Sequence, residues 1–247
     1  FRAPLNPYVY HIRAGDLSQY RKLVEYAQTI GVKRIAVAYA DIPFGTAGLA
    51  AIEGMLKKQG QNLVARIALP MADPARLPEI VDALARNSPD IVFMVSPAKL
   101  AGDFLKVYRA KGLSAPLAMP SYGNADVLCA IAGKDSARGV IMAQVMPNVS
   151  NTAIPIVRRF QEDIKKHGEK DMRPNILQLE AYVTTQVLLE GLRRAGPAAP
   201  RQKLVPALDA LKRLDLGGYT VEFGPTKHTG SEFVDISIIG RDCKLMF

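Results

Sequence analysis

Residues 31–60, GVKRIAVAYADIPFGTAGLAAIEGMLKKQG, limit what this chain can fold into more than any other stretch. Ile35–Ala40 is an unbroken apolar run that is too short for a buried helix, which favours a parallel β-strand covered on both faces. Asp41–Gly45 contains a proline and a glycine and reads as a turn. From Thr46 apolar residues recur at helical spacing, and Gly60 marks the end of the helix. The stretch therefore predicts a strand, a loop at the carboxyl end of that strand, and a helix.

The same alternation continues through the next eighty residues. Further strands are predicted at Asn62–Leu69, Ile91–Val95, Pro116–Met119 and Gly139–Val145. Helices are predicted at 17–30, 73–84, 98–111 and 125–132. Such an alternation indicates α/β architecture with a doubly wound parallel sheet. Because crossovers in such sheets are right-handed, the loops 41–45, 70–73, 96–98 and 120–124 are expected to meet at one edge of the sheet.

The segments outside this alternation have a different pattern. A short strand-like piece, Tyr8–Ile12, precedes it, and long helices follow at Ile154–His167, Asn175–Arg194 and Gln202–Leu214. The strands predicted after residue 147 are Tyr219–Phe223 and Phe233–Ile239, joined by a loop rich in Gly, Pro and Thr. We expect these helices to lack a sheet against which to bury their apolar faces.

Composition places the chain among ordinary globular proteins and excludes several partners. The 247 residues carry 32 Lys and Arg against 23 Asp and Glu, a net charge of +9, but the basic residues are scattered among acidic ones along the helices. This distribution favours solvated helix faces over a nucleic-acid surface. No apolar run approaches the length of a membrane span, and Phe1 is not followed by a signal-peptide pattern. Cys129 fits a core position, and a pair with Cys243 stays open.

The sequence gives catalysis no positive support. The segment after Phe44 lacks the lysine of a phosphate loop and the spacing of a dinucleotide fingerprint. The three histidines, His11, His167 and His228, are far apart and have no paired metal-ligand spacing. There is no Gly-x-Ser-x-Gly motif, and neither cysteine has the setting of a nucleophile. We expect neither an enzyme nor a cofactor or metal.

Polar and aromatic residues gather near the predicted loop edge. They are Tyr39, Phe44, Ser96, Ser121, Tyr122 and Gln144. Hydroxyl groups, main-chain N–H groups and aromatic walls suit a small polar molecule with an apolar part. The alternative is that Ser, Gly and Pro stand at these strand ends for backbone reasons alone.

Motifs along the whole chain resemble the type I periplasmic solute-binding proteins, and most closely the branched-chain amino acid (leucine/isoleucine/valine) family that serves ABC importers. The motifs are Gln19, Asp41-x-x-Phe44-Gly45, Asp90–Ser96, Pro120-Ser121-Tyr122, Gly139–Val145, Tyr182 and Leu188–Gly196. Phe1-Arg2 and Tyr10–Arg13 look like the crossover between the two lobes of that family. The resemblance rests on many weak motifs in the right order.

The resemblance implies two α/β lobes that close on a ligand by hinge motion. Residues 13–146 plus 231–247 would form lobe two, and residues 1–12 plus 147–230 the crossover and the C-terminal part of lobe one. The first part of lobe one, on the order of a hundred residues, is expected to be missing. The resemblance also adds Pro97, Ala98 and Leu177 to the candidate ligand-binding residues, at positions where the family often carries an aromatic.

The same resemblance implies a non-enzymatic, periplasmic protein that delivers a small solute to a membrane ABC permease. The acidic residue that holds the ligand ammonium in amino acid binders is not visible in Pro120–Asn124, and Asp126 reads as a helix-start residue. An aromatic or aliphatic carboxylate or an amide is therefore a credible ligand beside an amino acid. The exposed apolar face of a shortened chain is expected to self-associate.

Other classes stay open as alternatives. A transcription regulator would need a DNA-binding helix-turn-helix, and the sequence shows none. A flavodoxin-like enzyme or receiver domain would need features not implied here, such as a cluster of acids at one strand end. A sensory ectodomain or the effector-binding core of a regulator shares the fold.

Overall fold

The computed structural model describes residues 4–170, 172–197 and 201–247, and the chain divides into two compact units. Unit 1 comprises residues up to Gly15 and Val145–Val234, and unit 2 comprises Asp16–Gln144 and Asp235–Phe247. The chain therefore passes between the units three times, at 15/16, 144/145 and 234/235. Each unit is described separately below.

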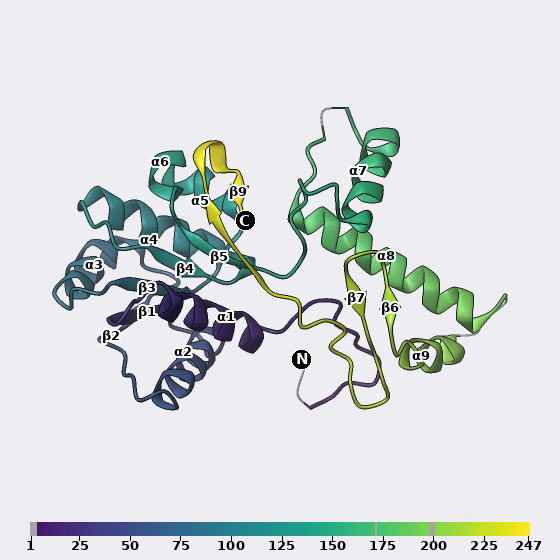
Figure 1. Cartoon of the computed structure of the whole chain (residues 1–247). Coiled ribbons are helices and arrows are strands. Elements are labelled where there is room, and N and C mark those ends of the chain that lie inside the picture. The colour runs from purple at the N-terminus through teal and green to yellow at the C-terminus, as the bar shows by residue number, and fades with distance from the viewer. Residues whose placement is uncertain (1–3, 171, 198–200) are drawn as a thin grey trace. The chain divides into compact units, whose positions relative to one another are not determined.

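Unit 2 is built on a seven-stranded sheet in the order β2-β1-β3-β4-β5-β8-β9 (Figure 1). Its strands are β1 (Ile35–Ala40), β2 (Ala65–Leu69), β3 (Ile91–Val95), β4 (Leu117–Met119), β5 (Ile141–Gln144), β8 (Asp235–Ile239) and β9 (Leu245–Met246). Neighbours from β2 to β5 run parallel, whereas β8 and β9 are each antiparallel to the preceding strand in the sheet. The predicted doubly wound parallel sheet is confirmed.

Helices cover both faces of this sheet. They are α1 (Asp16–Thr29), α2 (Pro43–Lys57), α3 (Leu77–Ala85), α4 (Ala98–Ala110), α5 (Ala125–Ala132) and α6 (Lys134–Ala137), with short 3₁₀ turns at Pro74–Arg76, Ser121–Gly123 and Arg241–Cys243. Ala36, Ala38 and Ala40 of β1 belong to the core that packs under α3, α4 and α5. The small residues of β1 let these helices approach the sheet closely, while α1 and α2 pack together and cover the other face (Figure 1).

A disulfide joins Cys129 of α5 to Cys243 of the C-terminal 3₁₀ turn, which resolves the alternative that the sequence left open. The bond spans 114 positions of sequence, and both cysteines belong to unit 2. In the sequence, Cys129 precedes the unit 1 segment Val145–Val234 and Cys243 follows it. The bond therefore links the C-terminal strands of unit 2 to a helix from the earlier part of the same unit.

Unit 1 packs helices around very little sheet. Its elements are α7 (Pro155–His167), α8 (Ile176–Ala195), α9 (Arg201–Asp209), β6 (Leu214–Asp215) and β7 (Thr220–Val221). The expectation that the helices could not bury their faces is only half right. Phe160, Leu179 and Val183 share a core with Tyr219, which lies in the turn of the β6–β7 hairpin, and with Phe223, which follows β7.

One face of α8 nevertheless stays exposed and apolar. Leu177, Leu188, Leu189 and Leu192 are among the large hydrophobic residues with the greatest exposure, at 43–56%. They lie on the side of the helix away from the buried residues Leu179, Val183, Val187 and Gly191. Leu188, Leu189 and Leu192 lie within one turn of each other near the C-terminal end of this stripe, and Leu177 lies near the start of α8, eleven positions earlier.

The structure corrects several predicted elements. Tyr8–Ile12 is not a strand, because only His11 forms a bridge, with Thr229. The predicted turn at 41–45 is shorter, since α2 already begins at Pro43, where proline is preorganised for a first helical turn. The helix predicted at Gln202–Leu214 ends at Asp209, and Leu214 belongs to β6.

The sequence pattern left the partners of the two C-terminal strands open. The second of them, β8, pairs with β5 in the large sheet, where Ile238 lies opposite Ile141. The partner of β7 is β6, which the sequence analysis did not predict. Strand β9 and helix α6 were missed as well, because segments of two and four residues carry too little periodicity.

Candidate functional site

The carboxyl edge of the unit 2 sheet contains the point where strand order reverses. The order β2-β1-β3-β4-β5 places β1 beside β3 although they are not consecutive strands. In open α/β sheets ligands bind in the crevice outside such a switch point. Tyr39 lies near the end of β1 and Phe44 follows that strand, and Ser96, Pro97 and Ala98 follow β3. The topology therefore brings these predicted site residues to one edge.

An aromatic pair forms at this edge. The rings of Phe44 and Tyr122 meet edge-to-face, with centroids 5.2 Å apart and planes at 71°. Phe44 is in the first turn of α2, and Tyr122 is in the 3₁₀ turn after β4. Phe44 is 36% exposed, so the pair offers a partly open apolar wall.

Helix α1 holds the loop after β4 in place through two polar contacts. The main-chain N–H of Ser121 donates to Oε1 of Gln19 at 2.8 Å, and Gln19 is completely buried. The hydroxyl groups of Tyr20 and Tyr122 are 3.2 Å apart. Burial raises the pKa of Tyr20 to about 12, so this hydroxyl keeps its proton even at moderately alkaline pH. The loop that carries Ser121 and Tyr122 is thus fixed by α1.

Sequence reasoning did not assign Gln19 and Tyr20 to the site. Both occupy the buried face of a helix that precedes the first strand, and their partners are 102 positions away. The helical spacing of Tyr20 with Leu23, Val24 and Ala27 gives the signal of a core face. Only the long-range packing distinguishes these two residues from core.

Ser96 is the polar residue at this edge whose hydrogen bonding is incomplete. Its side chain is completely buried, and its Oγ has no hydrogen-bond partner among the described residues. An unsatisfied buried hydroxyl costs about 1–3 kcal/mol. Such a group at the end of a strand beside the switch point is a candidate for contact with a polar atom of a ligand.

Three other predicted site residues are placed differently. Tyr39 is half-buried within β1, between Ala38 and Ala40 of the core. Gln144 is buried, and its Nε2 donates to Oγ of Ser237 on β8 at 3.0 Å, so this amide connects two strands. Leu177 belongs to unit 1, where it is exposed on α8. The roles of these residues in ligand binding stay predictions.

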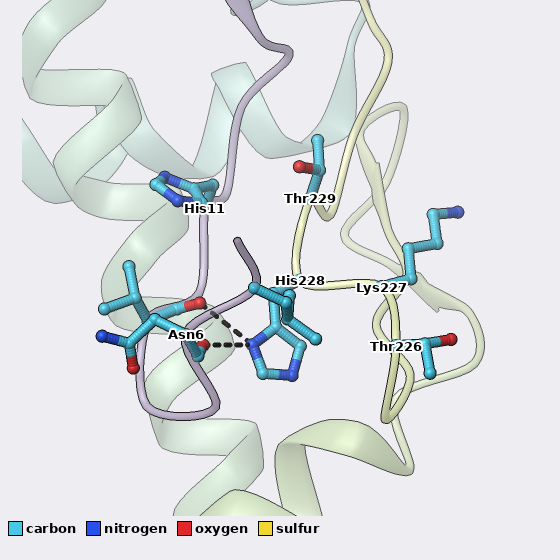
Figure 2. Close-up of a pocket in the computed structure, with 8 residues that line it drawn as sticks. Asn6, His11, Thr226, Lys227, His228 and Thr229 are labelled. Carbon is cyan, nitrogen blue, oxygen red and sulfur yellow. Dashed lines mark hydrogen bonds between the residues drawn. The ribbon is translucent and has the colours of Figure 1, made fainter. Parts of the chain in front are cut away.

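A second polar region lies in unit 1, around a cavity of about 170 Å³ (Figure 2). Its wall is formed by Leu5, Asn6, Val9, His11, Thr226, Lys227, His228 and Thr229. The Nδ1 of His228 lies 3.0 Å from the carbonyl oxygen of Asn6 and 3.1 Å from that of Val9. Because carbonyl oxygens only accept, this nitrogen carries a proton and donates.

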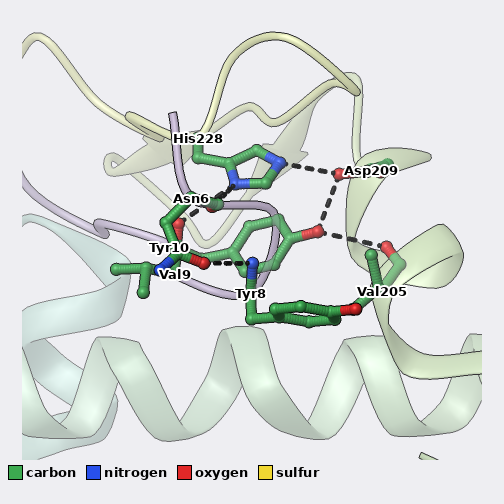
Figure 3. Close-up of polar contacts among 7 residues, drawn as sticks. All are labelled: Asn6, Tyr8, Val9, Tyr10, Val205, Asp209 and His228. Carbon is green, nitrogen blue, oxygen red and sulfur yellow. Dashed lines mark hydrogen bonds and ion pairs between the residues drawn. The ribbon is translucent and has the colours of Figure 1, made fainter. Parts of the chain in front are cut away.

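The other side of the His228 ring is also engaged (Figure 3). Its Nε2 lies 3.2 Å from Oδ1 of Asp209, which also accepts a hydrogen bond of 2.7 Å from the hydroxyl of Tyr10. The rings of Tyr10 and His228 stack with centroids 4.1 Å apart. Burial and the bond to Asp209 raise the pKa of Tyr10 above its usual value. Both ring nitrogens of His228 already have partners within the chain, so we assign this cluster a structural role.

The described residues contain no group of three or more His, Cys, Asp or Glu side chains arranged to hold a metal ion. Among the same residues, no helix combines the length and the apolar character that crossing a bilayer requires.

Comparison with known proteins agrees with this geometry. The family model described as periplasmic binding protein matches residues 3–236. The chain belongs to the periplasmic binding protein family. Its resemblance to the type I members is thereby confirmed, together with the α/β fold that the sequence predicts. No curated protein sequence matches this periplasmic binding protein.

Solved structures of similar fold come from several bacteria. An extracellular ligand-binding receptor from Verminephrobacter eiseniae is 27% identical, with a TM-score of 0.89, and the match covers 100% of this chain and 70% of that one. A substrate-binding periplasmic protein from Ralstonia solanacearum is 31% identical, with a TM-score of 0.86, covering 96% of this chain and 67% of that one. A leucine-binding protein from Thermotoga maritima shares the fold, with a TM-score of 0.79, at 16% identity, covering 99% of this chain and 68% of that one.

These neighbours are solute-binding proteins, and the family is extracytoplasmic. A branched-chain amino acid ABC transporter protein from Thermus thermophilus with bound valine, at 17% identity, shares the fold of this chain and does not identify its ligand. The comparisons therefore give the family and the general binding character, and leave the ligand to be argued from the site.

Proposed function

We propose that this chain is the solute-binding component of an ABC importer and binds a small amino acid or a related carboxylate or amide. The observation that carries the proposal is the buried Ser96 hydroxyl without a partner, located at the switch point. The ring pair of Phe44 and Tyr122 supplies an apolar wall at the same sheet edge. A polar group beside an apolar wall suits a small solute that has a charged or amide end and an apolar body.

In this proposal unit 2 corresponds to lobe two of the family, and unit 1 to the C-terminal part of lobe one. The ligand would favour a closed state by contacting both lobes, since a ligand shifts a conformational equilibrium only through its different affinities for the two states. The closed form would then be the one that a membrane permease recognises. No step of this mechanism requires a catalytic residue or cofactor.

The proposed location is the periplasm. The disulfide between Cys129 and Cys243 supports it, because disulfides form and persist in oxidising compartments outside the cytosol. The family's extracytoplasmic character points in the same direction.

A titration followed by NMR tests the proposal directly. L-leucine, L-valine, benzoate and benzamide are added separately, up to millimolar concentration, to ¹⁵N-labelled protein. We expect at least one of them to shift the amide signals of Phe44, Ser96 and Tyr122, with smaller changes elsewhere in unit 2. If all four compounds leave these signals in place, or shift only signals remote from this edge, the assignment of the site is wrong.

Matched variants sharpen the test. Phe44→Ala removes the exposed ring from the site, and we expect it to weaken binding of the active compound by about tenfold, the effect of losing one well-placed aromatic contact. Phe247→Ala removes a ring of similar exposure, 43% against 36%, from the end of unit 2, and should leave binding unchanged. Equal losses in the two variants would mean that the effect is not local to the site.

A further inference from the structure

The three segments that connect the units are the starting point. Their ends on the unit 1 side lie at residues 10–15, at Val145 and Met146, and at 229–234. These segments are far apart in sequence, so any motion between the units requires that they bend in a coordinated way. A side chain that contacts all three connecting segments would hold their unit 1 ends together, and bending of the segments would have to take place beyond that point.

The side chain of Tyr219 makes such contacts from within unit 1. Its hydroxyl lies 3.2 Å from the carbonyl oxygen of Ile12 in the first segment and 3.2 Å from that of Val145 in the second. Its ring meets the ring of Phe233 in the third segment edge-to-face, with centroids 5.9 Å apart. One phenol therefore contacts every connecting segment.

The hydroxyl of Tyr219 is buried and keeps its proton well into the alkaline range. The side chain is only 2% exposed, and its burial raises the pKa of Tyr219 to about 12. A phenol has a single proton to donate, so the carbonyl oxygens of Ile12 and Val145 share it. Removing the hydroxyl would leave two buried carbonyl groups with fewer donors.

A rigid turn presents Tyr219 to the segments. Gly217 and Gly218 precede it with φ angles of 84° and 90°, a conformation that favours glycine. The N–H groups of both glycines donate to Oδ1 of Asp215, at 2.8 and 3.2 Å. A Cβ at Gly218 would approach Cγ2 of Ile154 to 2.7 Å, so the turn also packs closely against the start of α7. The backbone before Tyr219 has little freedom.

Main-chain bonds join the first and third segments next to this contact point. The N–H of His11 donates to the carbonyl of His228 at 2.8 Å, and the N–H of Gly230 donates to the carbonyl of His11 at 2.7 Å. The two segments thus form a short parallel pair on the unit 1 side. Among the residues that the structure describes, no main-chain bond pairs Val145 or Met146 with these two segments, and the hydroxyl of Tyr219 links Val145 to the pair.

We propose that Tyr219 is a positioning residue that holds the unit 1 ends of all three connecting segments together, so that hinge bending takes place beyond them, toward unit 2. The hinge role rests on the proposed ligand-binding function. The clamp itself is a property of the free protein and is measured without ligand, so a failure to bind any solute would not decide it.

Hydrogen–deuterium exchange of Tyr219→Phe tests the clamp. The variant keeps the ring and removes only the hydroxyl. We expect amide exchange to accelerate by about fivefold to tenfold in residues 10–15, 145–146 and 229–234 together, since the loss of a shared hydrogen bond makes local opening easier. Amides of β1 and β3 in unit 2 should keep their protection.

Tyr108→Phe is the matched control. Tyr108 is equally buried, at 2% exposure, and its hydroxyl donates to a backbone carbonyl, that of Ala115, at 3.3 Å within unit 2. Its loss should leave the exchange of the connecting segments unchanged. Ser231→Ala is a second variant. It keeps Tyr219 and removes the Oγ that accepts from the N–H of Phe233 at 3.1 Å, so it should accelerate exchange at 229–234 more than at Val145. Unchanged exchange in Tyr219→Phe, acceleration in a single segment, or a uniform increase across unit 1 would each overturn the proposal.

Discussion

The two units of this periplasmic binding protein bury their cores in different ways. In unit 2 a seven-stranded sheet supplies two faces for helices, and β3 is buried along its whole length. In unit 1 the described strands are two residues long, and the core is made by α7, α8 and the residues around the β6–β7 hairpin. The stripe of exposed leucines on α8 belongs to the unit with little sheet. A helix with apolar residues on opposite faces needs covering on both, and only one of these faces is covered within unit 1.

Removal of the disulfide should produce the largest difference in stability between the two units. In a chain-entropy model, a cross-link over 114 positions stabilises the folded state by about 5 kcal/mol. Both cysteines are in unit 2, so Cys129→Ser with Cys243→Ser should lower the unfolding free energy of unit 2 much more than that of unit 1. Urea unfolding followed by NMR signals of β3 and α8 separates the two. Reduced wild-type protein should behave like the double variant, and an equal loss in both units would contradict the comparison.

The core of unit 1 is tested by two leucines of α8. Leu179 is completely buried, whereas Leu189 is 54% exposed. We expect Leu179→Ala to destabilise unit 1 by about 3 kcal/mol, through lost burial and the cavity left behind. Leu189→Ala should change stability by less than about 0.5 kcal/mol. Chemical denaturation of unit 1 measures both. Similar losses for the two variants would show that the exposed stripe is in fact packed.

The sequence predicted those elements whose signal is local. The bounds of β1 and β3 are confirmed, because an uninterrupted apolar run between turn residues determines a buried parallel strand. Helices α4 and α5 are also confirmed, within one residue. The pairing of β8 with β5 could not be predicted, since Ile238 and Ile141 are partners through tertiary structure alone. Propensity indicates that a strand forms and says little about its partner.

In the candidate site, too, some features follow from local sequence signals and others depend on tertiary contacts. Phe44, Ser96 and Tyr122 could be assigned to one sheet edge, because strand-end position and crossover handedness follow from the sequence pattern. The contact between Gln19 and Ser121 could not, since the helix containing Gln19 shows the periodicity of a core face. Which strand-end residues face a ligand depends on packing that a single sequence does not encode locally.

The space around two helical glycines differs between the units. A Cβ at Gly48 of α2 would lie 2.5 Å from Cγ1 of Val95 and 2.7 Å from the hydroxyl of Tyr20, both held by the sheet and its covering helix. A Cβ at Gly191 of α8 would lie 2.7 Å from Cδ2 of Leu208, the end of a flexible side chain. We therefore expect Gly48→Ala to destabilise unit 2 by about 2 kcal/mol through overpacking, and Gly191→Ala to have a much smaller effect.

Gly54→Ala is the control for the Gly48 prediction. Gly54 is in the same helix, and a Cβ there meets nothing within 4 Å. It should stabilise the protein by about 0.5–1 kcal/mol through helix propensity alone. Thermal unfolding of the three variants gives the order. Greater destabilisation by Gly191→Ala than by Gly48→Ala would reverse the inferred difference in packing.

Alkaline pH should weaken both units through buried tyrosines. The pKa is raised to about 12 by burial for Tyr20 in unit 2 and for Tyr219 in unit 1. Because the folded-state pKa lies above the unfolded value of 10.0, the stabilisation is fully present below pH 10 and is lost as pH rises toward 12. Each residue should contribute on the order of 1–2 kcal/mol to this loss.

Unfolding free energies at pH 8 and pH 11 check the alkaline prediction. Tyr219→Phe should reduce the pH dependence of unit 1 and leave that of unit 2 unchanged, and Tyr20→Phe should do the reverse. If neither substitution alters the dependence on pH, other groups are responsible for it.

The smallest expected effect lies at the exposed end of α8. Arg193 and Arg194 donate hydrogen bonds of 2.7–2.8 Å to the carboxylate of Glu190, which lowers its pKa to about 2. Since the folded-state pKa is lowered, the stabilisation is present above the unfolded value of 4.5 and is lost as pH falls toward 2. Solvent screening limits it to less than about 1 kcal/mol. Glu190→Gln should therefore destabilise unit 1 slightly at pH 7 and not at pH 2.5, as measured by urea unfolding. A loss at pH 7 comparable with that of Leu179→Ala would mean that ion pairs, and not burial, hold α8 in unit 1.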